Sequence, residues 1–212
     1  MKAKKLRLSN SNNNWKKTIN LIPSGVQTFS KMPVQHVEGV GPRYITRSKD
    51  CYSWDIDNNK YIDYMCGLGP IILGYADKIV NLAVSKEIKH GNIPSLPSPI
   101  ETKLAEKLVK IIPSAEMVRF GKNGSDVTQA AVRAARGITG RDKIAICGYH
   151  GWHDWYIGTT TRNLGVPDDV SKLSLKFFYN DINSLNNLFK KNKNKIAAVI
   201  LEPTNFIKPK KN

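Results

Sequence analysis

The run Asn123-Gly124-Ser125-Asp126 places small and polar residues at the start of a helical pattern. The apolar segment Met117–Phe120 before it predicts a short strand, and Val127–Gly137 after it has apolar residues at helical spacing. At a strand–turn–helix junction, free backbone N–H groups and the positive end of the helix dipole face the same place, which favours a bound phosphate. A Gly-Ser pair before a helix is more often an ordinary turn with a helix cap, so this motif alone leaves both interpretations open.

A second turn of this kind follows the next strand. Lys143–Cys147 predicts a short apolar strand, and Gly148-Tyr149-His150-Gly151 comes directly after it. In a parallel sheet both turns fall at the carboxyl ends of strands, where α/β proteins bind ligands. A phosphate site beside an aromatic side chain suits a flat, phosphorylated ring cofactor. The alternative for Tyr149 is a buried place in the core, which the flanking glycines disfavour.

Further motifs accompany these two turns. Together the motifs are Trp54-Asp55-Ile56-Asp57, Tyr61-Ile62-Asp63-Tyr64, Gly67-Leu68-Gly69-Pro70-Ile71-Ile72-Leu73-Gly74-Tyr75, Asn123-Gly124-Ser125-Asp126, Ala130-Ala131-Val132-Arg133-Ala134-Ala135-Arg136, Thr139-Gly140-Arg141-Asp142-Lys143 and Tyr149-His150-Gly151-Trp152-His153-Asp154. With these motifs the chain resembles the class III, pyridoxal-phosphate-dependent aminotransferases, and within them the glutamate-1-semialdehyde 2,1-aminomutase-like branch. The likeness extends from about Phe29 to Pro203.

The resemblance implies a fold, a reaction and a cofactor. The fold is α/β, that of the fold-type-I pyridoxal-phosphate-dependent transferases, with a mainly parallel sheet flanked by helices and preceded by a small antiparallel β meander. The reaction is that of an aminotransferase or aminomutase acting on amino-acid or amino-sugar-type substrates. The implied cofactor is pyridoxal 5'-phosphate, and the implied assembly is a homodimer.

The resemblance also implies which residues bind the cofactor: Asn123, Gly124, Ser125, Tyr149, His150 and Glu202. Gly124 and Ser125 would hold the phosphate, and Tyr149 would stack on the ring. Glu202, which precedes Pro203 at the end of a strand, would lie near the cofactor and position neighbouring groups. The alternative for Glu202 is an exposed carboxylate at a strand end.

Two residues that the family chemistry requires are absent. One is an Asp that keeps the pyridine nitrogen protonated, and the other is the Schiff-base Lys that also moves the proton. In relatives both lie well beyond the Glu-Pro pair, whereas Thr204–Asn212 contains no acidic residue, and its lysines follow the strand too closely. The resemblance therefore covers roughly the first half of a full-length relative. We expect this chain alone to be inactive and to require a chain or segment carrying the missing C-terminal half.

Other chemistries fit these residues less well. His150, His153 and Asp154 have ligand types that bind zinc, but Gly151 interrupts the run and no fourth ligand is apparent. Ser125 lacks the G-x-S-x-G turn of a hydrolase nucleophile. We therefore expect neither a metal ion nor a nucleophilic serine.

The composition raises one rival function. The 212 residues carry a formal net charge of +16, which is typical of a protein with a polyanionic partner. The Lys-rich runs do not alternate with aromatic residues as a stacking platform would. A non-catalytic protein that binds a phosphate ligand, or a basic protein that binds nucleic acid, is therefore the weaker alternative. We expect small-molecule amino donors and acceptors as partners, with no nucleic acid and no membrane.

The cysteines bear on the compartment. Cys51, Cys66 and Cys147 are an odd and widely spaced set. Such a set is typical of reduced thiols rather than of a disulfide framework, and so it indicates a cytoplasmic protein.

The remaining sequence shows how these motifs are positioned. We expect an N-terminal segment over residues 1–75 that contains the antiparallel meander, and an incomplete cofactor-binding large domain over residues 76–212, with about four strands of its sheet. Ser125 or Asp126 is expected to cap the helix and Gly140 to end it. The other expected elements are a helix at Trp15–Leu21, a meander at Tyr44–Met65, helices around Val80–Ile88 and Leu104–Ile112, a strand at Leu175–Phe178, a helix at Ile182–Phe189 and a strand at Ala197–Leu201. In relatives the region near Phe29-Ser30-Lys31 approaches the substrate.

Overall fold

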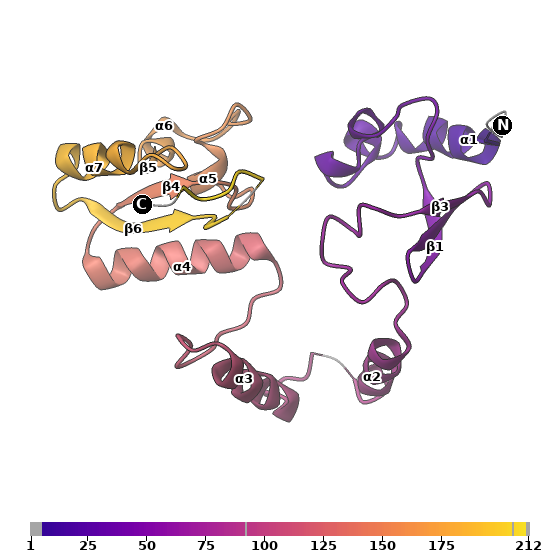
Figure 1. The fold of residues 1–212 in the computed structure, drawn as a ribbon, viewed down its shortest axis with the longest axis horizontal. Helices are drawn as coiled ribbons and strands as arrows, with labels where there is room; N and C mark the ends of the chain where they lie inside the picture. Colours follow the sequence, from indigo (N-terminus) through magenta and orange to yellow (C-terminus); the bar gives the residue numbers. More distant parts are fainter. Residues whose placement is uncertain (1–5, 92, 205, 211–212) are drawn as a thin grey trace. The chain divides into compact units, whose positions relative to one another are not determined.

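A computed structural model of the chain describes residues 6–91, 93–204 and 206–210. The chain divides into two compact units, Met1–Pro97 and Ser98–Asn212. The division falls later than the boundary expected after Tyr75, because helix α2 (Lys78–Ile88) belongs to the first unit. Figure 1 shows the elements of each unit.

The first unit is built around a three-stranded antiparallel sheet. Its strands pair in the order β1-β2-β3, as the pattern over Tyr44–Met65 predicts. Its elements are α1 (Ser9–Thr18), the 3-10 turns η1 (Pro23–Gly25), η2 (Phe29–Lys31) and η3 (Pro33–Gln35), strands β1 (Ile45–Lys49), β2 (Tyr52–Asp55) and β3 (Lys60–Ile62), and α2.

Helix α1 begins earlier than the sequence pattern predicts. It covers the polar run from Ser9, whereas we expected a helix only at Trp15–Leu21. The carboxylate of Asp57 accepts hydrogen bonds from the backbone N–H groups of Asn10 and Ser11, each at 2.8 Å. A carboxylate at the first turn satisfies unpaired N–H groups and complements the helix dipole, so a residue distant in sequence stabilises a helix of low intrinsic propensity.

Two carboxylates hold the turns of the meander. Asp55 is fully buried and accepts from the backbone of Asp57 and Asn59 and from the hydroxyl of Tyr61, at 2.7 to 2.9 Å. The carboxylate of Asp63 accepts a hydrogen bond from the hydroxyl of Tyr75 at 2.7 Å. Burial opposes its ionisation, but this bond and those from neighbouring residues keep the pKa of Asp63 below its usual value.

The second unit contains a parallel sheet with strand order β5-β4-β6. Parallel strands separated by helices match the predicted α/β class. Its elements are α3 (Pro99–Ile111), α4 (Gly124–Thr139), β4 (Lys143–Cys147), α5 (Asp154–Ile157), α6 (Asp168–Ser171), β5 (Ser174–Lys176), α7 (Ile182–Lys191) and β6 (Ile196–Leu201).

The strand expected at Met117–Phe120 is wrong. Within the described residues the segment pairs with no strand, and the sheet has three strands rather than four. The side chain of Met117 is 92% exposed. Apolar composition alone does not make a strand, because the backbone also needs a neighbouring strand to hydrogen-bond.

Helix α4 provides most of the packing that matters for the candidate site. Val132 packs with Ile144 and Ile146 of β4 in the core, and Figure 1 shows α4 beside β6 with α7 on the far side of the strands. Gly140 ends α4 with φ +63°, as predicted. The expected cap at Ser125 or Asp126 is wrong: Asn123 occupies the cap position, and its side chain accepts no hydrogen bond from the helix N–H groups but donates through its amide nitrogen to Asp126 at 3.0 Å.

Apolar side chains remain exposed on two helices. Neither α2 nor α3 has a buried residue, although α3 is amphipathic and has a complete capping box at Ser98 and Glu101. Ile79 is 80% exposed and Ile111 is 57% exposed. An apolar stripe on a well-capped helix requires a partner, so the described part of the chain does not by itself bury these helices.

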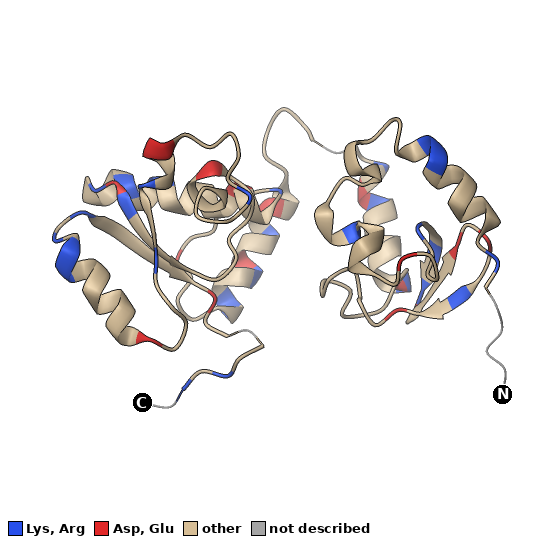
Figure 2. Ribbon diagram, turned by 90° about the horizontal axis from the view of Figure 1, so that it is seen from above, with Lys and Arg blue, Asp and Glu red and all other residues tan. Residues whose placement is uncertain are grey.

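The charges do not gather on one element. Figure 2 shows Lys and Arg on helices, strands and turns of both units, with Asp and Glu among them. No helix in the described part of the chain is long and apolar enough to cross a membrane.

Candidate cofactor site

The amino end of α4 is open. In the described structure no side chain caps this helix, and a Cβ added to Gly124 would meet no atom within 4 Å. The first N–H groups of a helix have no partner within the helix, and the helix dipole adds a partial positive charge at this end. Open space in front of these groups suits an anion.

Ser125 lies against the turn that follows β4. Its Oγ accepts from the backbone N–H of Trp152 at 3.3 Å. Because the oxygen acts here as an acceptor, the hydroxyl hydrogen can still be donated to another group. The turn comes this close only because Gly151 has no side chain: at φ +108°, its Cβ would lie 2.3 Å from the Ser125 Oγ.

Tyr149 lies on the surface of this turn, not in the core. Its side chain is 66% exposed, and its ring meets the edge of Tyr156 with centroids 5.5 Å apart. Tyr156 is buried with Trp155 in the core cluster that contains Ile144 and Ile146. One side of the Tyr149 ring is therefore held by a rigid support, and much of the ring is open to a ligand.

His150 has a structural place that the sequence did not reveal. Its ring is buried, stacks against Trp155 with centroids 6.2 Å apart, and has Nε2 2.9 Å from the carbonyl oxygen of Cys147. A carbonyl only accepts, so Nε2 carries the proton in this bond. The imidazole thus points into the core behind Tyr149, and its role toward a cofactor remains a prediction.

Glu202 lies beside the same turn. Its backbone N–H donates to the Cys147 carbonyl at 3.1 Å, and a Cβ on Gly148 would lie 2.6 Å from its Oε2. Burial, then the negative charge of Glu202, raise the pKa of the Cys147 thiol. Gly148, with φ +95°, makes room for the Glu202 carboxylate because it has no side chain. A glycine directly after strand β4 is the feature of the sequence that could have indicated this contact.

The two turns also approach each other at His153 and Asp126. His153 Nε2 and Asp126 Oδ1 are 3.7 Å apart, which pairs the second turn with the first turn of α4. Among the described residues, no group of three or more His, Cys, Asp and Glu side chains could hold a metal ion. The structure thus brings Gly124, Ser125, Tyr149 and Glu202 to one end of the sheet.

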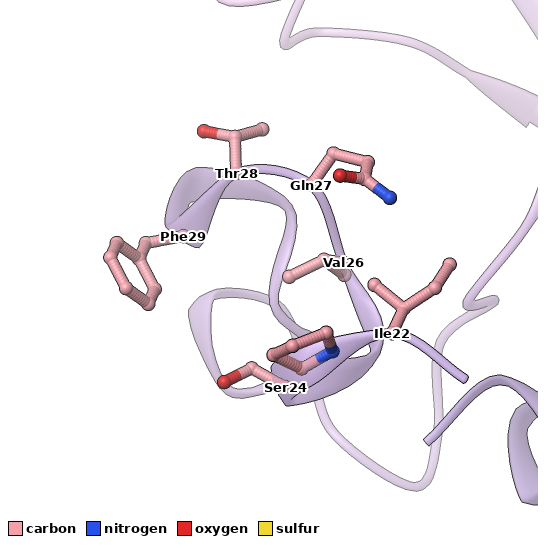
Figure 3. Close-up of a pocket in the computed structure, with 7 residues that line it drawn as sticks. Ile22, Ser24, Val26, Gln27, Thr28 and Phe29 are labelled. Atoms are coloured by element: carbon pink, nitrogen blue, oxygen red, sulfur yellow. The ribbon is translucent and has the colours of Figure 1, made fainter. Parts of the chain in front are cut away.

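A separate hollow lies in the first unit. It has a volume of about 280 Å³ and is lined by a single stretch of chain (Figure 3): Ile22, Pro23, Ser24, Val26, Gln27, Thr28 and Phe29. The lining has no ionisable side chain, so this hollow provides no acid–base chemistry of its own. It contains Phe29 from the region expected near the substrate.

The family follows from comparison with known proteins. The model of the family described as "Aminotransferase class-III" matches residues 34–205, most of the chain. The chain belongs to the class III aminotransferases. The turns at Gly124 and Tyr149 both lie within the matched range.

Two curated relatives illustrate the likeness of this class III chain. It is 38% identical over 202 residues to the 3-aminobutyryl-CoA aminotransferase of Cloacimonas acidaminovorans, covering 95% of this chain and 48% of the relative. It is 40% identical over 209 residues to the glutamate-1-semialdehyde 2,1-aminomutase of Francisella philomiragia, covering 92% and 47%. The chain therefore spans about half the length of the curated relatives it matches.

Solved structures show the same fold. The FumI protein of Sphingopyxis sp. MTA144, in its PLP internal aldimine form, matches with a TM-score of 0.83 and 31% identity, over 89% of this chain and 45% of that one. A transaminase with PLP bound matches with a TM-score of 0.87 over 95% of this chain and 49% of that one, at 23% identity. The fold of this class III chain is thus that of fold-type-I enzymes, over about half their length.

The contact between the two turns gives a first prediction. We expect Gly151→Ala to lower the free energy of unfolding by about 1–3 kcal/mol more than Gly165→Ala, because only the first places a Cβ against Ser125. Gly165 is the matched control: its φ is also positive, at +86°, but a Cβ there meets nothing within 4 Å. Urea unfolding of both variants measures the difference, and equal losses would show that the turns are not in contact.

Proposed function

We propose that this chain is the phosphate-binding, N-terminal part of a pyridoxal-phosphate-dependent aminotransferase or aminomutase. The open amino end of α4 beside the exposed ring of Tyr149 carries the proposal. Family membership supports it, as do relatives named as an aminotransferase and an aminomutase. The reaction class is amino-group transfer between small molecules, or migration of an amino group within one, on amino-acid-type substrates.

The residues present fit the cofactor. The space beside Gly124 is open, and the uncapped N–H groups of the first turn of α4 would stabilise a phosphate dianion there, with the Ser125 hydroxyl as a further donor. The exposed ring of Tyr149 offers a flat surface for the pyridine ring. Pyridoxal phosphate, when bound, supplies the electron-accepting ring on which amino-group chemistry depends.

The chain's own residues hold and orient this cofactor rather than react. The first turn of α4 at Asn123, Gly124 and Ser125, here called the cradle, would fix the phosphate. Tyr149 would fix the plane of the ring, and the carboxylate of Glu202 adds a negative charge beside the turn. The Asp that faces the pyridine nitrogen and the Lys that binds the cofactor covalently belong to the C-terminal half of the family's length. We propose that this half completes the site, either as a continuation of the chain or as a second chain, and that the complete enzyme is a cytoplasmic homodimer.

One consequence concerns covalent binding. The pKa of a free lysine is near 10.4, so only about one in a thousand is neutral at pH 7. An exposed lysine lacks the burial and neighbouring charge that would lower this value. We therefore expect borohydride reduction of the 212-residue chain with pyridoxal phosphate to label lysines diffusely and incompletely, as mapped by mass spectrometry. One lysine labelled to completion, together with turnover of an amino donor, would contradict this assignment.

The cradle itself is tested by filling it. We expect Gly124→Val to weaken pyridoxal phosphate binding by roughly tenfold or more, because its side chain would occupy the space of the phosphate and remove charged hydrogen bonds. A Cβ at this position meets no protein atom within 4 Å, so the substitution begins in open space. Calorimetric titration measures the affinity.

The matched control for this titration lies on the same helix. Gly137 of α4 also has open space at its Cβ position, so Gly137→Val has the same change of side chain without reaching the cradle. We expect Gly137→Val to bind like the parent. If Gly124→Val binds equally well, the phosphate lies elsewhere.

A further inference from the structure

Besides Ser125, a second hydroxyl group of α4 contacts the turn that carries Tyr149. Thr128, in the second turn of α4, is half-buried, and its Oγ1 lies 3.0 Å from the carbonyl oxygens of both Ser125 and His150. Its one hydrogen is shared between these two acceptors. The bond to Ser125 lies within the helix, whereas the bond to His150 crosses to the turn that carries Tyr149. The carbonyl of His150 belongs to the residue directly after Tyr149.

The backbone on either side of Tyr149 is held at several points. Gly148 lies against Glu202, and Gly151 lies against Ser125. The ring of Tyr149 contacts that of Tyr156. The residue directly after Tyr149 is held twice, since the ring of His150 bonds to the Cys147 carbonyl in the core and the His150 carbonyl accepts from Thr128.

We propose that Thr128 is a positioning residue, which sets the distance between the phosphate cradle and the ring of Tyr149. This inference rests on the proposed function. Pyridoxal phosphate has a fixed length, so its phosphate and its ring bind together only where the cradle and the stacking surface are correctly spaced. Binding of inorganic phosphate requires the cradle alone. The hydroxyl of Thr128 thus contributes to the affinity for the cofactor and not to the affinity for phosphate.

The plainer interpretation is a hydroxyl bonded back to its own helix, which is common for Thr in helices. The same helix provides an example: Thr139 Oγ1 donates to the carbonyl of Ala135 at 2.7 Å and accepts from the backbone N–H of Arg141 at 3.2 Å, both local to the carboxyl end of α4. Thr139→Val is therefore the matched control, because it removes a helical hydroxyl bond at the far end of α4.

The test compares Thr128→Val, Thr128→Ser and Thr139→Val in the full chain. Calorimetric titrations with pyridoxal phosphate and with inorganic phosphate measure the two affinities. Hydrogen exchange of the ligand-free chain measures the protection of the Trp152 N–H, which is bonded to Ser125. We expect Thr128→Val to lose about tenfold in affinity for pyridoxal phosphate and to bind inorganic phosphate within about twofold of the parent. The backbone N–H of Trp152 should exchange faster in this variant than in the parent. Thr128→Ser should restore all three values, and Thr139→Val should match the parent.

The outcomes separate the inference from the function on which it rests. If the parent binds pyridoxal phosphate and Thr128→Val binds it equally well, the positioning role is overturned and the proposed function stands. An equal loss of both affinities also overturns it, because Thr128 would then only support the helix. A parent that binds no pyridoxal phosphate overturns the proposed function together with the positioning role. If Thr128→Val does not fold, Thr128→Ala removes the same hydroxyl with less added apolar surface.

Discussion

The first turn of α4 rests directly on the turn that follows β4, and the candidate site depends on this contact. Gly151 has no side chain, so the backbone comes within hydrogen-bonding distance of Ser125, and Thr128 adds a hydrogen bond across the same junction. One turn presents the unpaired N–H groups of a helix and the other presents an aromatic ring. In the proposed function these two features form one binding site, next to a helix and a strand that pack in the core.

The sequence predicted those parts of the fold whose signals are local. The meander, α4 with its stop at Gly140, and strands β4 and β6 follow from periodicity and from glycine placement. The errors arose where a residue distant in sequence determines whether a helix or strand forms. Asp57 caps α1 across a long stretch of sequence, and Met117–Phe120 has no neighbouring strand in the described residues. The candidate residues followed from motifs, but the burial of the His150 ring and the bond from Thr128 to its carbonyl depend on tertiary packing.

The exposed apolar surface of α2 and α3 is consistent with a chain that spans only part of the length of its relatives. Helices α2 and α3 have no buried residues, and the second unit has only three strands within its described part. The chain spans about half of the curated relatives that it matches. These two facts have a common explanation if the surfaces of α2 and α3 are covered in the complete enzyme, where burial of their apolar side chains would stabilise the fold.

The most direct test of the account is the ionisation of the cofactor phosphate. The second pKa of a phosphate monoester is about 6, so the ³¹P signal of free pyridoxal phosphate shifts with pH around this value. A phosphate bound at the amino end of α4 is stabilised as the dianion, because the helix end and the N–H groups interact more strongly with two charges than with one. We expect the ³¹P signal of pyridoxal phosphate bound to this chain to keep its dianion position from about pH 8 down to about pH 5.5. A bound signal that follows the titration curve of the free cofactor would contradict it.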